Sequence, residues 1–168
     1  MAVGSLGWID GKPRYFSGAV SDELAVQLDR AARLTDPLER ESILLAARRR
    51  WPHALDIMIA LYKLYFRTAR FPEAERMAWQ ALREASCQGG FRWNYRLLRP
   101  DSADWLEDRS VSRLYLFSLK ALGVIRLRQG RVVLAERALA KVLELDPHDE
   151  IGAGNFLIIA RQCLEDDV

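Results

Sequence analysis

Few side chains in this chain have the type and spacing that metal binding requires. His53 and His148 each follow a proline, and neither has a second histidine, a cysteine or a carboxylate at ligand spacing. The two cysteines, Cys87 and Cys163, form neither a disulfide framework nor a metal-ligand pattern. The sequence therefore predicts no metal and no cofactor.

The carboxylates that lie closest together do not have the setting that catalysis needs. Asp104, Glu107 and Asp108 form a cluster, but general acid–base catalysis needs carboxylates that converge in an apolar pocket. These three flank a turn, so we expect them to be solvated. The chain has no glycine-rich phosphate loop and no nucleophile elbow. We therefore expect no enzyme, no catalytic residue and no small-molecule substrate.

Length and composition are those of one ordinary folded domain. The chain has 168 residues, half of them apolar, so it can bury a sizeable core. A formal net charge of +2 is too small to indicate nucleic acid by itself. No apolar run is long enough to span a bilayer, and the N-terminus lacks the pattern of a signal peptide. We expect a cytoplasmic protein without membrane insertion.

The clearest element is the stretch 116–149, which divides into two amphipathic helical halves. Apolar residues recur at steps of three and four in each half, and the break falls at Gly130. Glycine takes positive φ without steric cost, so it suits a turn between helices. Pro147 prevents the second helix from continuing.

This stretch resembles a tetratricopeptide repeat (TPR), a helix–turn–helix unit of about 34 residues. With Leu116 as its first position, Leu122 and Gly123 match the large–small pair, and Ala135 matches the small residue where the helices cross. The chain departs from the repeat pattern at Leu119, where the family usually has tryptophan, and at Arg126, where it usually has tyrosine.

The resemblance extends to the rest of the chain. A degenerate repeat covers 21–53, a second repeat starts at Leu55 with Ala74 at its crossing, and a final helix near 150–165 caps the array. The predicted fold is therefore all-α, a TPR-like helical-repeat solenoid of about three helix–turn–helix units plus a C-terminal capping helix. Residues 1–20 precede this domain (21–168) as an extended arm.

Two segments fall outside the repeats. The insertion at about 87–113 is too long for a passive connection, and its aromatic residues argue against disorder. We expect a short helix near 102–108, or an extension of the next helix, and at least partial burial of Trp93 and Trp105, two candidate partner-binding residues. The arm carries Trp8, Tyr15 and Phe16, which we expect to pack on the first helix of the chain or on a partner.

The resemblance also implies a binding surface. In TPR proteins the first helix of each repeat lines a concave groove. This position implies the following candidate partner-binding residues: Ile59, Lys63, Phe66 and Arg67 in the second repeat, and Phe117, Lys120, Val124 and Arg128 in the third. Such a mixture of basic and apolar side chains suits a peptide or helix with acidic and apolar residues. Alternatively, the arm or the insertion fills the groove.

The function implied is a non-catalytic interaction module, either an adaptor or an assembly chaperone for a larger bacterial complex. The size and the aromatic insertion are also similar to those of small TPR proteins encoded among bacterial nitrogen-fixation genes. One alternative is self-association into a homodimer. The other, a nucleic-acid-binding helical repeat, is disfavoured because three irregular repeats are too few for a base-reading code.

Overall fold

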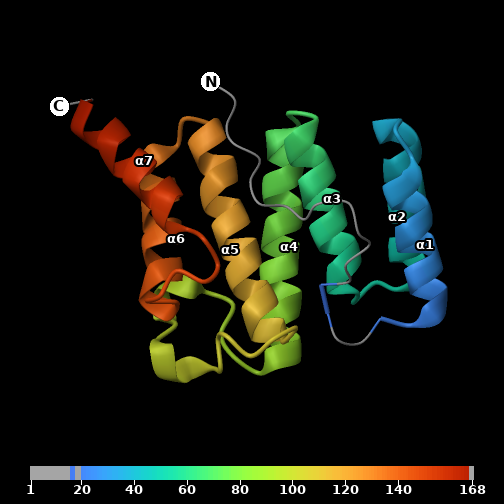
Figure 1. The fold of residues 1–168 in the computed structure, drawn as a ribbon, viewed down its shortest axis with the longest axis horizontal. Helices are drawn as coiled ribbons and strands as arrows, with labels where there is room; N and C mark the ends of the chain where they lie inside the picture. The colour runs from blue at the N-terminus through green and yellow to red at the C-terminus, as the bar shows by residue number, and fades with distance from the viewer. Residues whose placement is uncertain (1–15, 18–19, 167–168) are drawn as a thin grey trace.

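The computed structural model describes residues 16–17 and 20–166, and these residues form helices and turns without strands (Figure 1). The helices are α1 (Asp22–Arg33), α2 (Pro37–Arg50), α3 (Leu55–Arg67), α4 (Phe71–Gly89), α5 (Val111–Arg128), α6 (Val132–Leu145) and α7 (Gly154–Asp166). Two 3₁₀ turns, η1 (Tyr95–Leu97) and η2 (Pro100–Ser102), lie between α4 and α5. The all-α prediction is confirmed for this part of the chain.

Helix starts follow from local chemistry. The Ser21 hydroxyl accepts from the Leu24 N–H at 3.3 Å at the start of α1. The Asp36 carboxylate accepts from the Leu38 N–H at 3.0 Å at the start of α2, whose first residue is a proline. The Ser110 hydroxyl accepts from the Arg113 N–H at 3.1 Å and starts α5. These caps satisfy N–H groups that have no partner inside the helix.

The turns within the later helix pairs share one backbone conformation. Gly130 has φ +72° between α5 and α6, as its position in the repeat predicted. Ala69 has φ +57° in the equivalent turn between α3 and α4. An alanine is uncommon in this region, so the packing of the two helices must hold it there.

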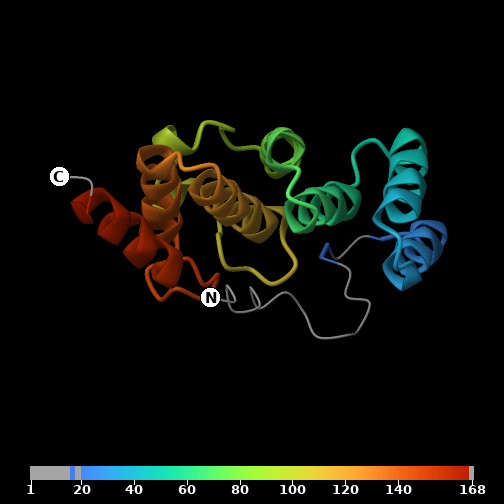
Figure 2. The same cartoon turned by 90° about the horizontal axis from the view of Figure 1, so that it is seen from above.

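Consecutive helices run in opposite directions, and each packs against the next from α1 to α7 (Figure 1). The helices α3 and α5 also touch, while α4 lies across the other side of both (Figure 2). The first helices of the second and third predicted repeats are therefore neighbours. The long insertion does not separate them.

Close helix crossings use the small residues that the sequence indicated. Ala74 of α4 and Ala135 of α6 are completely buried. At the contact of α5 with α6, a Cβ built on Gly123 would lie 2.6 Å from Leu139 Cγ. Only glycine fits there, because no real Cβ approaches another atom so closely.

The predicted insertion is partly helical. The helix α4 continues to Gly89, and α5 begins at Val111, five residues before the expected repeat start at Leu116. The extension of the next helix is therefore confirmed. The helix near 102–108 is wrong: only the turn η2 forms, because the Trp105 indole N–H donates to the Arg99 carbonyl at 3.0 Å and folds the segment back on itself.

The two tryptophans of the insertion have different environments. Trp105 is only 4% exposed and packs against Phe91 and Tyr115, with ring centroids 5.1 and 5.9 Å away. Trp93 is 46% exposed and contacts Trp79 edge to face. The insertion is thus anchored to α4 and α5 through its aromatic residues, with one ring left at the surface.

The capping helix α7 buries Leu157 and Ala160 but leaves Ile158 and Ile159 about half exposed. It begins at Gly154, later than expected, because the Asp149 carboxylate accepts from the N–H groups of Ala153 and Gly154. The expectation of an apolar inner face and a polar outer face therefore holds only in part. The exposed isoleucines form an apolar edge at this end of the array.

Candidate partner-binding surface

The structure brings the predicted residues of α3 and α5 together. Lys63 of α3 lies close enough to Lys120 of α5 for their charges to interact. The Arg128 guanidinium of α5 is 5.8 Å from the ring centroid of Phe66 on α3 and 5.3 Å from that of Phe71. We call this surface the α3–α5 face; it carries Asp56, Lys63, Phe66, Arg67, Phe117, Lys120 and Arg128.

Two predicted apolar anchors are not open to a partner. Ile59 is 1% exposed and Val124 is 4% exposed. Both were expected to line an open groove, because a repeat position says which side of a helix a residue occupies but not what covers it. The half-buried rings of Phe66 and Phe117 remain the apolar side chains that a partner could reach.

Part of the arm occupies one end of this face. Asp56, at the start of α3, is 2% exposed, and its carboxylate accepts hydrogen bonds from the N–H groups of Phe16 and Ser17 and from the Ser17 hydroxyl. The Lys63 ammonium lies 4.2 Å from the centroid of the Phe16 ring. Each contact satisfies a buried charge or orients an aromatic ring.

The expected place of the arm therefore needs correction. The described arm residues Phe16 and Ser17 bind α3 rather than the first helix, while Trp8 and Tyr15 lie outside the described residues. The physical reason is the buried Asp56 carboxylate, which accepts hydrogen bonds from the N–H groups of Phe16 and Ser17. The alternative in which the arm fills the groove gains support at this end.

Burial lowers the pKa of both lysines on the face. Burial, and then the nearby charges of Arg67 and Lys120, lowers the pKa of the Lys63 ammonium to about 7. Burial also lowers the pKa of Lys120, against the opposing effect of Asp149. The Lys120 ammonium donates to the Ile151 carbonyl at 2.7 Å. Lys63 is thus less able to steer an acidic partner than a solvated lysine would be.

The pKa of Lys63 predicts how stability depends on pH. Between about 7 and its ordinary value of 10.5 the unfolded chain binds more protons at this site than the folded chain, so stability rises with pH. We expect the free energy of unfolding to rise by roughly 2 kcal/mol through this site between pH 7 and about pH 9. The Lys63→Met variant should lose that rise in urea unfolding at the two pH values.

The control for this experiment is Lys141→Met. Lys141 lies on α6, where its ammonium contacts the Glu144 carboxylate at 2.7 Å and the Leu98 carbonyl at 3.1 Å. That variant should keep the parent's rise in stability with pH. Equal pH dependence in the parent and Lys63→Met would show that Lys63 is fully charged in the folded chain at neutral pH.

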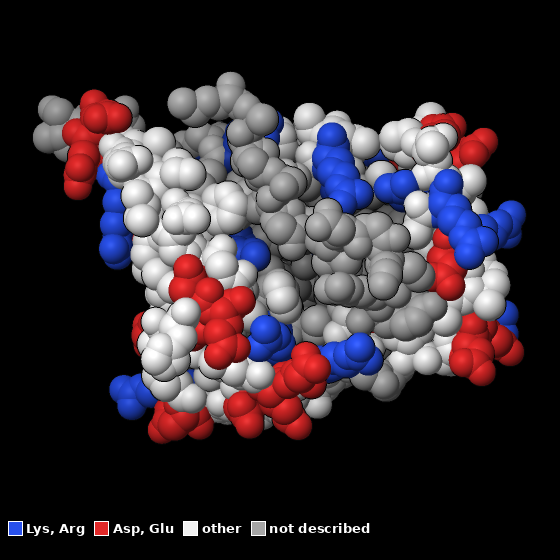
Figure 3. Space-filling view, viewed as in Figure 1, with Lys and Arg blue, Asp and Glu red and all other residues white. Residues whose placement is uncertain are grey.

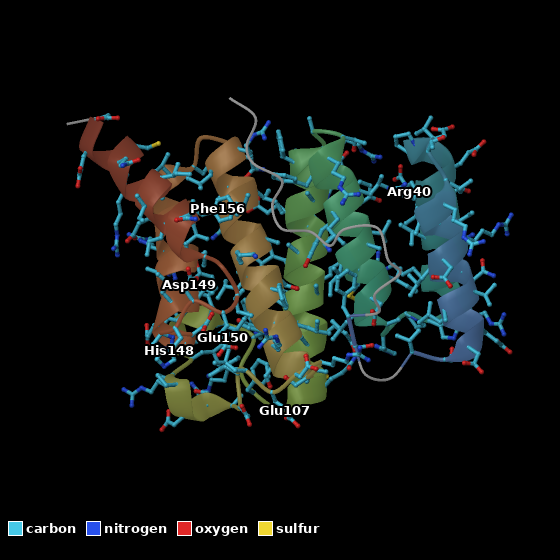
Figure 4. All side chains as sticks on the ribbon, in the orientation of Figure 1. Arg40, Glu107, His148, Asp149, Glu150 and Phe156 are labelled. Carbon is cyan, nitrogen blue, oxygen red and sulfur yellow. The ribbon has the colours of Figure 1, made fainter. Side chains whose placement is uncertain are left out.

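Acidic side chains lie beside the basic residues of α5, which the sequence did not indicate. Figure 4 shows Asp149 and Glu150 on the connection between α6 and α7, next to α5, and Glu107 at the foot of α5. Glu150 approaches the Arg113 guanidinium at 3.4 Å. Acidic groups accordingly gather on the lower left of this side of the molecule, interleaved with basic ones (Figure 3). The positive charge on the α5 side of this surface is therefore partly offset by acidic side chains of the same chain.

The rest of the described chain offers little other chemistry. No group of three or more histidine, cysteine or acidic residues in it could hold a metal ion. Cys87 and Cys163 are free thiols, and the His53 ring lies 3.1 Å from the Glu84 carboxylate. Among the described helices, none combines the length and the apolar character needed to cross a bilayer.

Comparison with known proteins finds a bacterial relative. The chain is 30% identical over 169 aligned residues to an uncharacterized 19.8 kDa protein in the nifW 5′ region of Azotobacter chroococcum mcd 1. The alignment covers 93% of this chain and 89% of that protein. The chain belongs to the family of this 19.8 kDa protein. No family model and no solved structure matches this chain.

For this family, the structure adds a surface that is built from two parallel helices and part of an N-terminal segment. The residues that carry it come from three separate stretches of sequence: Phe16 and Ser17, the helix α3, and the helix α5. Position in a repeat could indicate the helices. It could not indicate the arm, because the contact of Ser17 with Asp56 spans 39 residues of sequence.

Proposed function

We propose that the chain is a non-catalytic, TPR-like interaction module that binds a short segment of a partner protein on the α3–α5 face. The observation that carries this proposal is the binding of the arm at Asp56. We call this place, where Phe16 and Ser17 contact Asp56 and Lys63, the seat. The buried Asp56 carboxylate accepts hydrogen bonds from two consecutive backbone N–H groups, those of Phe16 and Ser17, which lie in a bend of the arm. In this chain the arm occupies the site that we propose for the partner segment.

Several features support the TPR-like character of the module. The helices pair and stack in chain order, the small residues Ala74 and Ala135 are buried at crossings, and the positive-φ turns at Ala69 and Gly130 are equivalent. These features come from two stretches of sequence that match the same repeat. They favour a helical-repeat scaffold, on which binding is a property of surface side chains.

The surface around the seat indicates the chemistry of the partner. In this chain the Lys63 ammonium lies over the Phe16 ring. An aromatic ring of a partner could make the same contact with Lys63. Further along, Phe66 offers a half-buried ring beside the exposed guanidinium groups of Arg67 and Arg128. We infer a partner segment with an aromatic residue at the seat and with acidic and apolar residues beyond it.

The genetic setting of the relative suggests where such a partner belongs. That protein is described as lying in the nifW 5′ region. Together with the similarity to small TPR proteins encoded among nitrogen-fixation genes, this setting favours a role as an adaptor or assembly chaperone for a multi-subunit enzyme. The proposed function concerns protein binding and requires no chemistry at the site.

The test uses a fluorescent peptide with the sequence of residues 12–20 of this chain. The arm of the full-length parent competes with the peptide at high effective concentration. The double variant Phe16→Ala/Ser17→Pro removes the ring, the hydroxyl and one N–H donor, so it should bind the peptide at least about tenfold more tightly than the parent does. Fluorescence anisotropy measures both affinities.

Adding Asp56→Asn to that double variant should abolish the gain. Asp22→Asn is the matched control, because Asp22, like Asp56, lies in the first turn of its helix but is exposed. It should leave peptide binding unchanged. Equal affinity of the parent and the double variant would contradict occupancy by Phe16 and Ser17, and binding that survives Asp56→Asn would place the peptide elsewhere.

Self-association is the second candidate function, favoured by the apolar edge of α7. Ile158 is 55% exposed and Ile159 is 47% exposed on adjacent positions of the last helix. A second copy could cover them. Light scattering at two protein concentrations separates the candidates: a tight dimer that Ile158→Ser/Ile159→Ser dissociates favours self-association, and a monomer favours the adaptor.

A further inference from the structure

A second candidate surface lies on the other side of the molecule, where the insertion meets the end of α4. Trp93 is 46% exposed and Leu97 is 53% exposed. Both line one open cleft of about 710 Å³, together with Arg83, Cys87, Arg92 and Asn94. We call this surface the Trp93 cleft. Large apolar side chains that are exposed together in one hollow often mark a binding site.

The exposed ring is held in place by the residues around it. Its edge-to-face contact with Trp79 has a centroid distance of 6.0 Å, and the Arg83 guanidinium lies 4.9 Å from its centroid. The Trp93 carbonyl accepts from the Tyr115 hydroxyl at 2.7 Å. A ring that is already fixed loses little conformational entropy when a ligand covers it, which is the property of an interface anchor.

The charge of the cleft is one-sided. Arg83 and Arg92 line it, Arg96 lies exposed on the adjoining turn η1, and no carboxylate is among the lining residues. Tryptophan and arginine are the side chains that most often dominate binding energy at protein interfaces. A complementary ligand would bring negative charge to the arginines and an apolar group to Trp93 and Leu97.

We propose that the Trp93 cleft binds a short acidic segment of a partner protein, with an apolar side chain of that segment against Trp93 and Leu97 and its carboxylates on Arg83 and Arg92. A protein segment fits better than an anionic membrane, because the apolar side chains line a hollow instead of projecting from the surface. This cleft is independent of the α3–α5 face.

The two surfaces can be occupied at the same time. The cleft is built from α4 and the residues after it, and α4 lies across one side of α3 and α5 (Figure 2). Phe16 and Ser17 instead bind Asp56 at the start of α3. A chain with two such surfaces can join two protein segments. The insertion therefore supplies the second binding surface of a bridging protein.

The test is selection of a displayed library of short random peptides on the immobilised full-length protein. Selection should enrich sequences with a tryptophan, phenylalanine or leucine beside two or more carboxylates. The affinity of a synthetic copy of an enriched peptide should fall at least about tenfold with Trp93→Ala and with Arg92→Glu. The matched control Arg49→Glu makes the same charge change on an exposed residue of α2 and should not alter the affinity.

Using both variants keeps the result interpretable if Trp93→Ala perturbs the insertion, since Arg92 is exposed. Asp56→Asn should leave the selected peptide bound, which separates this cleft from the proposed function of the α3–α5 face. The proposal is overturned if no acidic peptide is enriched, or if neither variant weakens binding. It is also overturned if the cleft instead binds anionic vesicles, an oligonucleotide or a second copy of the chain in a way that Trp93→Ala abolishes.

Discussion

Replacing Trp105 with alanine is expected to lower the free energy of unfolding by about 3–5 kcal/mol. The ring is 4% exposed, it packs between Phe91 and Tyr115, and its indole N–H donates to the Arg99 carbonyl at 3.0 Å. Alanine would leave a cavity at the base of α5 and remove the part-buried hydrogen bond to the Arg99 carbonyl. Urea unfolding followed by circular dichroism measures the loss.

Trp93→Ala is the matched control for that experiment, because it removes the same side chain from the same insertion. Trp93 is 46% exposed, so its removal leaves no closed cavity, and we expect a loss of only about 1 kcal/mol from the contact with Trp79. Equal losses for the two variants would mean that the insertion does not pack on α5 as described. A large loss for Trp105→Ala alone would establish the aromatic cluster as part of the core.

Replacing Ala135 with leucine is expected to cost about 1–3 kcal/mol of stability. Ala135 is completely buried on α6. One turn further along α6, Leu139 packs so closely on Gly123 of α5 that a Cβ at position 123 would clash with it. The extra carbon atoms have no space there unless the helices move apart. Thermal and urea unfolding of the purified variant measure the loss.

The control is Ala46→Leu, the same change at an exposed position of α2, which should alter stability by less than about 0.5 kcal/mol. In a double-mutant cycle with Leu139→Ala, the double variant should lose less stability than the sum of the two single losses, since Leu139→Ala frees volume beside the new side chain. An Ala135→Leu variant with the parent's stability would count against a close crossing of α5 and α6, and thus against the repeat assignment.

The helices of this protein were determined largely by short-range features of the sequence. Ser21 and the Asp36–Pro37 pair begin α1 and α2 through local caps, and Gly130 takes the positive φ that a tight turn requires. The burial of Ala74 and Ala135 could likewise be predicted, because both hold the small position of a helix–turn–helix repeat. Caps, turns and apolar periodicity act within a few residues, so one sequence is enough to recognise them.

Tertiary structure alone decided the candidate surfaces. The sequence did not distinguish Trp93 from Trp105, and only the fold around Tyr115 buries one and exposes the other. The sequence did not indicate that Phe16 and Ser17 would donate hydrogen bonds to the Asp56 carboxylate. These contacts join residues that are distant in sequence, and their energies depend on burial and on the charges that other helices bring near. Periodicity therefore identifies the helix that carries a side chain, whereas packing determines whether a partner can reach it.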